Sequence, residues 1–405
     1  MIRDEIEALL TEAASAAKRA GLLPDITVPV GIVERPSNPS HGDYATSLPL
    51  RLARAARMRP LDIARAVVDH LPTNEFFERV EVVAPGFVNF TLSQRWLAAQ
   101  VGQIAAQGKS FGNVDLGQGR SVQVEFVSAN PTGPLTAASG RGGALGDALA
   151  NVLSAAGYRA FREYYVNDAG NQMEVFNQTI YARYLQALGQ DAEIPDEGYR
   201  GTYMIDLASE IASKHGARFL ESPKEEAAVE LGTIAREMLL QDIRSTVDQM
   251  GINYDVWFSE RGLYDRGLID QCIAYLRERG YVGDRDGAVW LLSTALGQDK
   301  DDVLIRSNGL PTYFAADIAY HYDKFKVRGL DRVIDIWGAD HAGHVPRMKA
   351  AVAALGVDPD GFDVIIHQMI TLLRGGEEVK ISKRTGNIVT LREVLDEAGA
   401  DACRF

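Results

Sequence analysis

Lys380 and Lys383 lie three residues apart in a stretch rich in Ser, Thr and Gly, residues 380–387. Two ammonium groups on such a loop can meet a triphosphate and stabilise the charge that develops on departing pyrophosphate. Two lysines at this spacing alone would favour a solvated basic loop. The longer string, with Ser382 between the lysines, is more specific and predicts a cationic lid over a nucleotide site.

A turn rich in Gly and Pro, residues 128–143, follows an apolar run and precedes a helical pattern. A strand that passes through such a turn into a helix directs free backbone N–H groups at an anion. Gly140 and Gly142, with Gly146 further on, resemble a dinucleotide fingerprint, although the last glycine comes one residue late. Close packing between helix and strand explains these glycines equally well. Polar residues around the turn favour a ligand: Glu125, Ser128 and Asn130.

Asp340 and His341 directly follow the apolar run 333–337. The carboxyl end of a strand is where open α/β sheets bind ligands, so both residues are candidate ligand contacts. His341 and His344 also have a spacing that metal ligands can have, but no third and fourth ligand follows at a useful distance in the sequence. We therefore expect no metal site.

Tyr313 and Asp317 are four residues apart, so on a helix they share one face. An aromatic wall beside a carboxylate suits a long cationic side chain such as a guanidinium. A helix N-terminal acid next to a core tyrosine explains the pair at least as well.

The chain has 405 residues, which suggests two or three domains, and its 46% apolar and 24% charged residues are ordinary for a globular protein. No stretch approaches the ~20 apolar residues of a membrane span, and the charged start lacks the features of a secretory signal. We therefore expect a cytoplasmic protein with no membrane partner. The two cysteines, Cys272 and Cys403, exclude disulfide frameworks and paired-cysteine zinc sites. The net charge of −13 opposes long-range attraction of nucleic acid but is compatible with a local basic groove.

Two regions differ in their pattern of elements. Residues 1–107 combine helical stretches with short β runs, two of them within 78–92, and we interpret them as a small α+β domain. A glycine-rich linker between Gly108 and Gly119 follows. The predicted helices of this first domain span residues 1–20, 44–58 and 61–71.

Residues 118–395 alternate strands with helices, which is typical of a parallel α/β sheet. Residues 172–253 interrupt the alternation with a mainly helical pattern, so we interpret them as an insertion. The predicted strands are 122–127, 159–166, 289–292, 303–306, 333–337 and 363–366, and the predicted helices between them include 141–156 and 345–355.

Taken together, these strings resemble the class I aminoacyl-tRNA synthetases, and specifically the arginyl-tRNA synthetase family. Residues 380–383 are similar to the family's Lys-Met-Ser-Lys string, with Ile381 in place of Met. Residues 41–46 resemble the family's N-terminal domain, which contacts the D-loop corner of tRNA. The strings that carry the resemblance, in the family's order, are 124–134, 163–170, 256–260, 337–341 and 380–383.

The resemblance implies a Rossmann-like parallel sheet with a helical insertion, preceded by a small α+β N-terminal domain. It also implies a monomeric arginine–tRNA ligase that uses ATP with Mg2+ to form arginyl-adenylate from L-arginine and transfers the arginyl group to tRNA(Arg). In the family, tRNA binding usually precedes activation of the amino acid. By the same resemblance, arginine would be held by Glu125, Ser128, Asn130, Tyr313 and Asp317. Carboxylates in fixed geometry match a planar guanidinium better than a lysine ammonium.

The resemblance also assigns the nucleotide and tRNA contacts. ATP would be bound by Thr136, Ser139, Gly140, Gly338, Asp340, His341, Gln368 and Ser382, with Lys380 and Lys383 as the catalytic residues. The tRNA would contact His41, Asp43, Tyr44, Arg51 and Arg54.

The sequence departs from the family in two places. Where class I enzymes carry His-x-Gly-His, residues 136–139 read Thr-Ala-Ala-Ser, which bring no imidazole and add a methyl group at Ala138. We therefore expect impaired adenylate formation. The family also continues into a helical anticodon-binding domain, of which residues 396–405 would be only the start. We expect the chain to lack that domain and to bind tRNA weakly and in a strongly salt-dependent manner.

Two alternatives remain open. In the first, the chain is a catalytically inactive or repurposed synthetase paralogue that binds arginine or a nucleotide. A nicotinamide-dependent (NAD) oxidoreductase that uses Gly140 and Gly142 is a more distant alternative, because it leaves the lysine loop and the arginine-like pocket unexplained.

Overall fold

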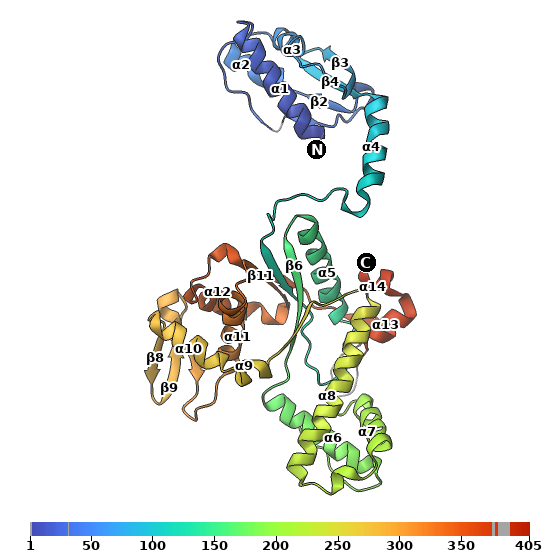
Figure 1. Ribbon diagram of the computed structural model, residues 1–405, viewed down its shortest axis with the longest axis vertical. Helices are drawn as coiled ribbons and strands as arrows, with labels where there is room; N and C mark the ends of the chain where they lie inside the picture. Colours follow the sequence, from blue (N-terminus) through green and yellow to red (C-terminus); the bar gives the residue numbers. More distant parts are fainter. Residues whose placement is uncertain (1, 31, 375–376, 380–388) are drawn as a thin grey trace. The chain divides into compact units, whose positions relative to one another are not determined.

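The computed structural model describes residues 2–30, 32–374, 377–379 and 389–405. The chain divides into two compact units, Met1–Phe111 and Gly112–Phe405 (Figure 1). The division falls inside the glycine-rich stretch 108–119. No described helix combines the length and the apolar character that crossing a bilayer requires.

The first unit is an antiparallel sheet covered by helices. Its strands have the order β1-β2-β4-β3, and each pair is antiparallel. Apolar side chains of the helices and strands share one core, which includes Ile6, Leu10, Ile63 and Phe90. The elements are α1 (Ile2–Arg19), β1 (Val33–Glu34), η1 (Pro39–His41), β2 (Tyr44–Thr46), α2 (Leu48–Ala56), α3 (Pro60–Val68), β3 (Phe77–Val83), β4 (Phe87–Leu92) and α4 (Gln94–Gln107).

The predicted helix at residues 44–58 is wrong at its start, because Tyr44–Thr46 form strand β2 instead. These residues pair with β4, and Thr46 is fully buried there. Helix α2 begins only at Leu48, with Pro49 in its first turn. Proline is well tolerated there because the first N–H groups of a helix have no partner within the helix.

The second unit is built on a five-stranded parallel sheet with the order β12-β11-β5-β6-β7. The chain builds the sheet outward from β5 to β7 and then returns to the other side of β5 with β11 and β12. The strand order therefore reverses between β5 and β11, and open α/β sheets bind ligands at such a point. The strands are β5 (Ser121–Glu125), β6 (Arg159–Val166), β7 (Val256–Ser259), β11 (Arg332–Gly338) and β12 (Phe362–His367).

Helices cover both faces of this sheet. Helix α5 (Ser139–Ala155) packs on β5, β6 and β11. The approach is close enough that a Cβ added at Gly146 would meet the Phe126 ring at 2.1 Å. The opposite face is covered by helices that share a second apolar core with Val333 and Phe362. Those helices are α10 (Leu268–Glu278), α11 (Tyr313–Tyr322) and α12 (Val345–Ala354), with the short α9 (Arg261–Asp265) beside them.

The predicted helical insertion is present between β6 and β7. Helices α6 (Asn171–Ala187), α7 (Thr202–His215) and α8 (Lys224–Gln249) pack on one another around their own apolar core. Figure 1 shows them gathered at one end of the unit, apart from the small sheet that contains β8 and β9.

Two predicted strands of the parallel sheet lie elsewhere. Residues 289–292 and 303–306 contribute to a separate antiparallel sheet of β8 (Val282–Arg285), β9 (Ala288–Leu291) and β10 (Asp302–Ile305). Asp286 and Gly287 join β8 to β9, and both have positive φ, 51° and 73°. Such a two-residue turn closes a hairpin, so these strands pair locally instead of extending the parallel sheet.

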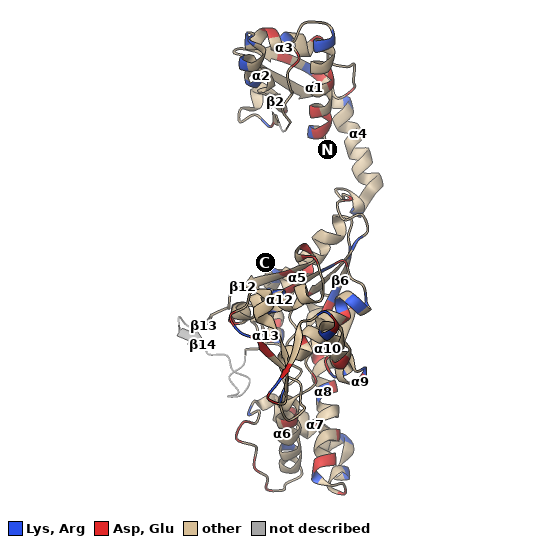
Figure 2. Ribbon diagram, turned by 90° about the vertical axis from the view of Figure 1, so that its left-hand side faces the viewer, with Lys and Arg blue, Asp and Glu red and all other residues tan. Residues whose placement is uncertain are grey.

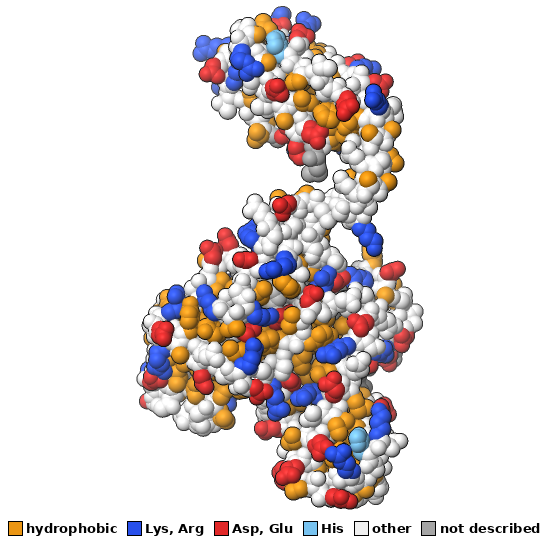
Figure 3. Space-filling view, viewed as in Figure 1, with side chains coloured by type: hydrophobic (Ala, Val, Ile, Leu, Met, Phe, Trp, Pro, Cys, Tyr) orange, Lys and Arg blue, Asp and Glu red, His pale blue; other side chains and the backbone are white. Residues whose placement is uncertain are grey.

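Acidic and basic side chains are interspersed over the face of each unit in Figure 3, so that face shows no separation by sign of charge.

The remaining elements follow the last parallel strands or join the others. They are the short helices η2 (Gly108–Ser110), η3 (Arg218–Leu220), η4 (Ser293–Leu296), η6 (Ala339–His344) and η7 (Pro359–Gly361), the π-helical turn η5 (Asp323–Val327), strands β13 (Leu372–Arg374) and β14 (Glu377–Val379), and helices α13 (Leu391–Ala398) and α14 (Ala400–Arg404).

Candidate active site

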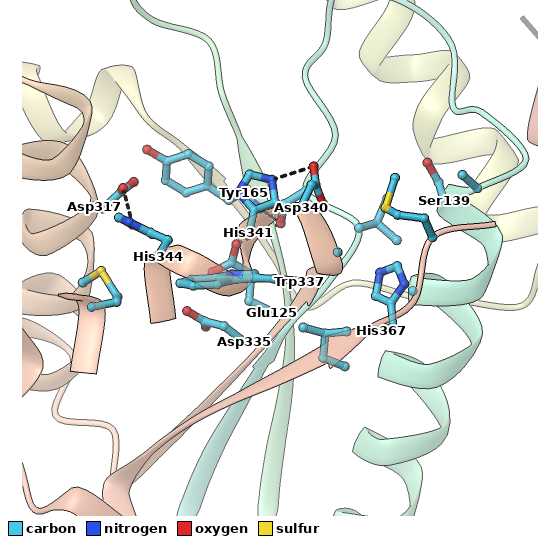
Figure 4. Close-up of a pocket in the computed structure, with 18 of the residues that line it drawn as sticks. Glu125, Ser139, Tyr165, Asp317, Asp335, Trp337, Asp340, His341, His344 and His367 are labelled. Carbon is cyan, nitrogen blue, oxygen red and sulfur yellow. Dashed lines mark hydrogen bonds and ion pairs between the residues drawn. The ribbon is translucent and has the colours of Figure 1, made fainter. Parts of the chain in front are cut away.

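A cavity of about 450 Å3 opens where β5 and β11 end, at the point where the strand order reverses. Figure 4 shows its labelled side chains converging from the sheet, from α5 and from the α11–η6 side. Its polar and aromatic lining includes Glu125, Ser128, Ser139, Tyr165, Asp317, Tyr320, His321, Asp335, Trp337, Asp340, His341, His344 and His367.

The turn after β5 is held in a conformation that residues with side chains seldom adopt. Val127 and Ser128 have φ values of 68° and 41°, a region that is unfavourable for a β-branched residue such as valine. The Ser128 hydroxyl donates to Glu125 Oε1 at 3.0 Å and accepts the backbone N–H of Tyr165 at 3.1 Å. Backbone strain of this kind persists where neighbouring contacts hold it, and it is common at functional sites.

The α5 end of the cavity contains Ala138 and Ser139. Ser139 is the first residue of α5, and its backbone N–H donates to the Thr136 carbonyl at 2.9 Å. The backbone of this segment pairs with residues 389–391: Ala137 N–H donates to the Val389 carbonyl at 2.9 Å. The end of α5 that faces the cavity is therefore fixed against the start of α13.

The α11 side of the cavity is acidic. Asp317 lines the cavity and accepts a hydrogen bond from His344 Nε2 at 3.2 Å (Figure 4). Glu260, directly after β7, is only 3% exposed. Burial, together with the negative charges of Asp317 and Asp168, raises the pKa of Glu260 to about 7, although a hydrogen bond with Tyr165 opposes the shift. A buried carboxyl group whose pKa is raised by burial and by neighbouring negative charges favours a cationic ligand.

Glu125 is placed differently, because it faces a buried cation. Its Oε2 accepts a hydrogen bond from Lys324 Nζ at 2.7 Å. Burial raises the pKa of Glu125 despite the nearby Lys324 charge, and the Asp335 carboxylate adds to the increase. The charge of Glu125 is thus already paired within the protein.

Comparisons with known proteins agree with this geometry. The model of the family described as "tRNA synthetases class I (R), catalytic domain" matches residues 100–405, and that of "Arginyl tRNA synthetase N terminal domain" matches residues 2–92. The chain is 49% identical over 404 residues to the arginine–tRNA ligase of Dehalococcoides mccartyi strain CBDB1, and the match covers 100% of this chain and 72% of the relative. The chain belongs to the arginyl-tRNA synthetase family.

Other relatives and solved structures are consistent with this family. The arginine–tRNA ligase of Desulforudis audaxviator is 49% identical, with 100% of this chain and 72% of the relative covered. An arginyl-tRNA synthetase structure from Campylobacter jejuni matches with a TM-score of 0.70 and 38% identity, over 78% of this chain and 68% of that one. The Thermus thermophilus structure matches with a TM-score of 0.60 over 100% of this chain and 73% of that one; at 23% identity this likeness concerns the fold.

The structure brings together three of the five residues that the family resemblance assigns to arginine. Glu125, Ser128 and Asp317 line the cavity. Asn130 lies outside the lining, and its side-chain amide donates to Gln172 Oε1 at 2.6 Å. Tyr313 is also outside the lining and is 56% exposed.

The residues assigned to ATP divide in the same way. Ser139, Gly338, Asp340 and His341 line the cavity. Outside its lining lie Thr136, whose backbone forms a bridge with Thr390; Gly140, which faces Leu391; and Gln368, whose neighbours His367 and Met369 do line the cavity.

The lysine string of the family lies outside the described residues, and so do Lys380, Ser382 and Lys383. Described residues on its two sides are placed by other contacts. Met369 and Ile370 line the cavity before the string, and Val389 after the string is hydrogen-bonded to Ala137.

The residues assigned to tRNA all lie in the first unit. His41, Arg51 and Arg54 are exposed, and Figure 2 shows basic residues on α2. Asp43 Oδ2 instead accepts the backbone N–H of Leu92 at 2.8 Å, and Tyr44 is 8% exposed within the core. Tyr44 is thus part of the core, and Asp43, although exposed, holds the Leu92 backbone; the exposed side chains of His41, Arg51 and Arg54 can contact a ligand.

The sequence contained a signal for several residues that we did not single out. Asp335 lies inside the apolar run 333–337 and Glu163 inside strand β6, and both are buried. A charged residue within a buried parallel strand must be paired, so these two positions marked a buried polar network. Glu260, Lys324 and His367 had no comparable signal.

Among the described residues, no group of three or more His, Cys, Asp and Glu side chains is arranged to hold a metal ion. The two histidines with metal-like spacing face carboxylates instead: His341 Nε2 lies 3.5 Å from Asp340 Oδ2, and His344 contacts Asp317.

Proposed function

We propose that this cavity binds L-arginine and ATP with Mg2+ and forms arginyl-adenylate for transfer to tRNA(Arg), in a monomeric cytoplasmic enzyme. The observation that carries the proposal is the carboxyl pair on the α11 side of the cavity: Asp317 lines the cavity, and the buried Glu260 lies near enough for the Asp317 charge to act on it. Burial first, and then the charges of Asp317 and Asp168, raise the pKa of Glu260 to about 7, and a bound guanidinium would offset that negative charge. The family membership gives this cation its identity.

In the proposed first step, a carboxylate oxygen of arginine attacks the α-phosphorus of ATP, and the bond to the bridging oxygen breaks to release pyrophosphate. In the second step, a ribose hydroxyl at the end of tRNA attacks the acyl carbon, and AMP leaves. Asp317 would orient the guanidinium, and the Ser139 hydroxyl would donate to a phosphate oxygen. Lys380 and Lys383 would supply the positive charge that stabilises pyrophosphate.

We also propose that adenylate formation is weak. Ala138 and Ser139 line the cavity where the family carries Gly and His, so a methyl group and a hydroxyl replace bare backbone and an imidazole. The loss of one preorganised donor typically costs about 2.7–4 kcal/mol of transition-state stabilisation. Weak adenylate formation would bring the chain close to the alternative of an inactive paralogue, a synthetase relative that binds arginine and nucleotide with little turnover.

The oxidoreductase alternative has less support. The glycines on which it depends are explained by packing, because Gly146 faces the Phe126 ring, Gly140 faces Leu391 and Gly142 faces His367. A Cβ added at any of the three would meet a side chain at 3.3 Å or less, which accounts for glycine at these positions without a bound pyrophosphate.

Titration calorimetry with ATP and Mg2+, with and without L-arginine and tRNA, tests the proposal. Arginine should tighten ATP binding, whereas citrulline, which has the same shape but no positive charge, should not. ATP binding that is indifferent to arginine, both with and without tRNA, would remove the support for a shared site.

A further inference from the structure

Lys324 is a lysine with 0% exposure, directly behind the cavity. It lies in the π-helical turn η5 that continues α11. Its Nζ donates to Glu125 Oε2 at 2.7 Å and to Asp335 Oδ1 at 2.9 Å, and it lies 4.1 Å from the centre of the Tyr320 ring. An ammonium has three donors, and two of them are used by carboxylates that line the cavity.

His321 completes this group from the preceding turn of α11. Its Nε2 lies 2.9 Å from Asp335 Oδ2, and its Nδ1 lies 2.8 Å from the backbone carbonyl oxygen of Asp317. Both partners are acceptors, so the contacts are satisfied together when both ring nitrogens carry protons. Burial alone would raise the pKa of Asp335, but Lys324 and His321 outweigh it and hold that pKa below its ordinary range.

These four side chains form a closed group, here called the buried quartet: Glu125, Asp335, Lys324 and His321. Two carboxylates face the Lys324 ammonium and the His321 ring, whose two acceptor partners fit a doubly protonated imidazole, and each side chain contacts at least one other member. A buried ion-pair group is a weak means of stabilising a core, because desolvation offsets the attraction between the charges. Its geometry, by contrast, allows each carboxylate only one orientation.

The quartet acts on two of the carboxylates that line the cavity besides Asp335, namely Glu125 and Asp317. It holds Glu125 directly, while Ser128 donates to the other Glu125 oxygen at 3.0 Å. It also holds Asp317, because His321 fixes the carbonyl of that residue within α11. The side chain of Asp317, 42% exposed, remains open toward the cavity and contacts only His344 among the described ion-pair partners.

We propose that Lys324 and His321 are positioning residues for the amino-acid substrate. They fix the Glu125 carboxylate at the cavity wall and cancel its charge. Asp317 therefore supplies the net negative charge that a cationic side chain meets in the cavity, and Glu125 acts as an oriented hydrogen-bond acceptor. This inference rests on the proposed function, since it concerns how the same cavity distinguishes arginine.

Two variants separate positioning from simple stabilisation. Lys324→Met leaves two buried carboxylates with one cation, so the melting temperature should fall and arginine binding should weaken. Lys324→Met combined with Asp335→Asn restores the balance of charge, so much of the melting temperature should return. The dissociation constant for arginine should nevertheless stay roughly tenfold or more above that of the unmodified chain, with ATP binding changed less than about twofold.

A matched control is available on the other face of the sheet. Arg162 Nε and Asp147 Oδ1 form an ion pair of 2.8 Å in which Asp147 is buried and Arg162 partly buried, and neither residue lines the cavity. Arg162→Met combined with Asp147→Asn should leave arginine binding unchanged. Equal arginine affinity in the balanced Lys324 variant and the unmodified chain would overturn the proposal, and so would an equal loss in the control.

A spectroscopic measurement keeps the inference testable if the Lys324 variants do not fold. In protein labelled with 15N-histidine, both ring nitrogens of His321 should carry protons at neutral pH, and His321→Asn assigns the signal. A neutral His321 ring would overturn the quartet. Failure of the unmodified chain to bind arginine would instead overturn the proposed function, and this inference with it.

Discussion

The backbone N–H of Leu391 donates to the carbonyl oxygen of Leu135 at 2.8 Å. This bond joins the segment before α5 to the residues that directly follow the lysine string. Thr390 lies between Val389 and Leu391 and caps α13. Its hydroxyl accepts a hydrogen bond from the backbone N–H of Glu393, and the Glu393 carboxylate accepts one from the backbone N–H of Thr390. The cavity end of α5 and residues 389–391 therefore depend on the same short contact.

Replacement of Thr390 by alanine should weaken ATP binding. The lost cap typically costs about 1 kcal/mol, and it loosens the segment that pairs with residues 135–137. We expect a slightly lower melting temperature and a several-fold weaker ATP affinity by calorimetry. Ser93→Ala removes a similar cap, from α4 in the first unit, and should lower stability without any effect on ATP. Equal ATP affinity in the two variants would contradict the contact's role.

Single restorations of the family motif should not be equivalent. Ser139 lines the cavity and Thr136 does not. Ser139→His should therefore accelerate arginine-dependent exchange of pyrophosphate into ATP by about 100-fold, on the scale of one regained transition-state donor. Thr136→His should give much less. The order of effects would be reversed if the phosphates lay on the Thr136 side.

Arginine affinity should depend on pH through Glu260. Its pKa is raised from 4.5 to about 7, so the folded protein holds this proton more tightly than the unfolded chain does. The group's stabilising contribution is complete below about pH 4.5 and is lost as the pH rises through about 7. Arginine binding needs the ionised form, so its affinity should increase between about pH 6 and pH 8. Calorimetry at several pH values measures the pH dependence of arginine affinity. The Glu260→Gln variant should lose this dependence, and an unchanged dependence in that variant would assign it to another group.

Weak tRNA binding should depend on the exposed arginines of α2. Arg51→Ala with Arg54→Ala should lower tRNA affinity and reduce the salt dependence by about one unit of slope per lost phosphate contact. A control pair, Arg277→Ala with Arg285→Ala, removes the same charge from arginines already paired with Asp284 and Asp301. Filter binding over a range of salt concentrations compares the two pairs. An equal loss in both would mean that net charge alone attracts the tRNA.

Much of the second unit was predictable because its strands are rich in apolar and aromatic residues and alternate with helical patterns. Strand β6 has the predicted bounds, and β11 and β12 differ from their predictions by one residue at each end. Local patterns could not show pairing, so β9 and β10 were assigned to the wrong sheet and β2 was interpreted as helix. Pairing is a tertiary property, set by partners such as the β4 strand for Tyr44–Thr46.

Part of the cavity lining was predictable from residues that follow strands. Glu125, Ser128, Asp340 and His341 were singled out in that way, Asp317 by its helical spacing from Tyr313 and Ser139 by the family resemblance; all six line the cavity, and their roles stay predictions. Lys324 was not predictable, because it stands between Asp323 and Phe325 in a stretch that resembles a solvated turn. The π-helical turn alone directs it inward, and no sequence period corresponds to a single turn of that kind.

The central claim is that one cavity holds arginine beside the nucleotide. Binding of a non-hydrolysable arginyl-adenylate analogue, with a sulfamoyl group in place of the phosphate, tests it independently of turnover. The account predicts one bound analogue per chain, tighter than arginine or ATP alone, with binding lost in Asp317→Asn and absent for the lysyl analogue. Equal binding of the arginyl and lysyl analogues, or full binding by Asp317→Asn, would contradict it.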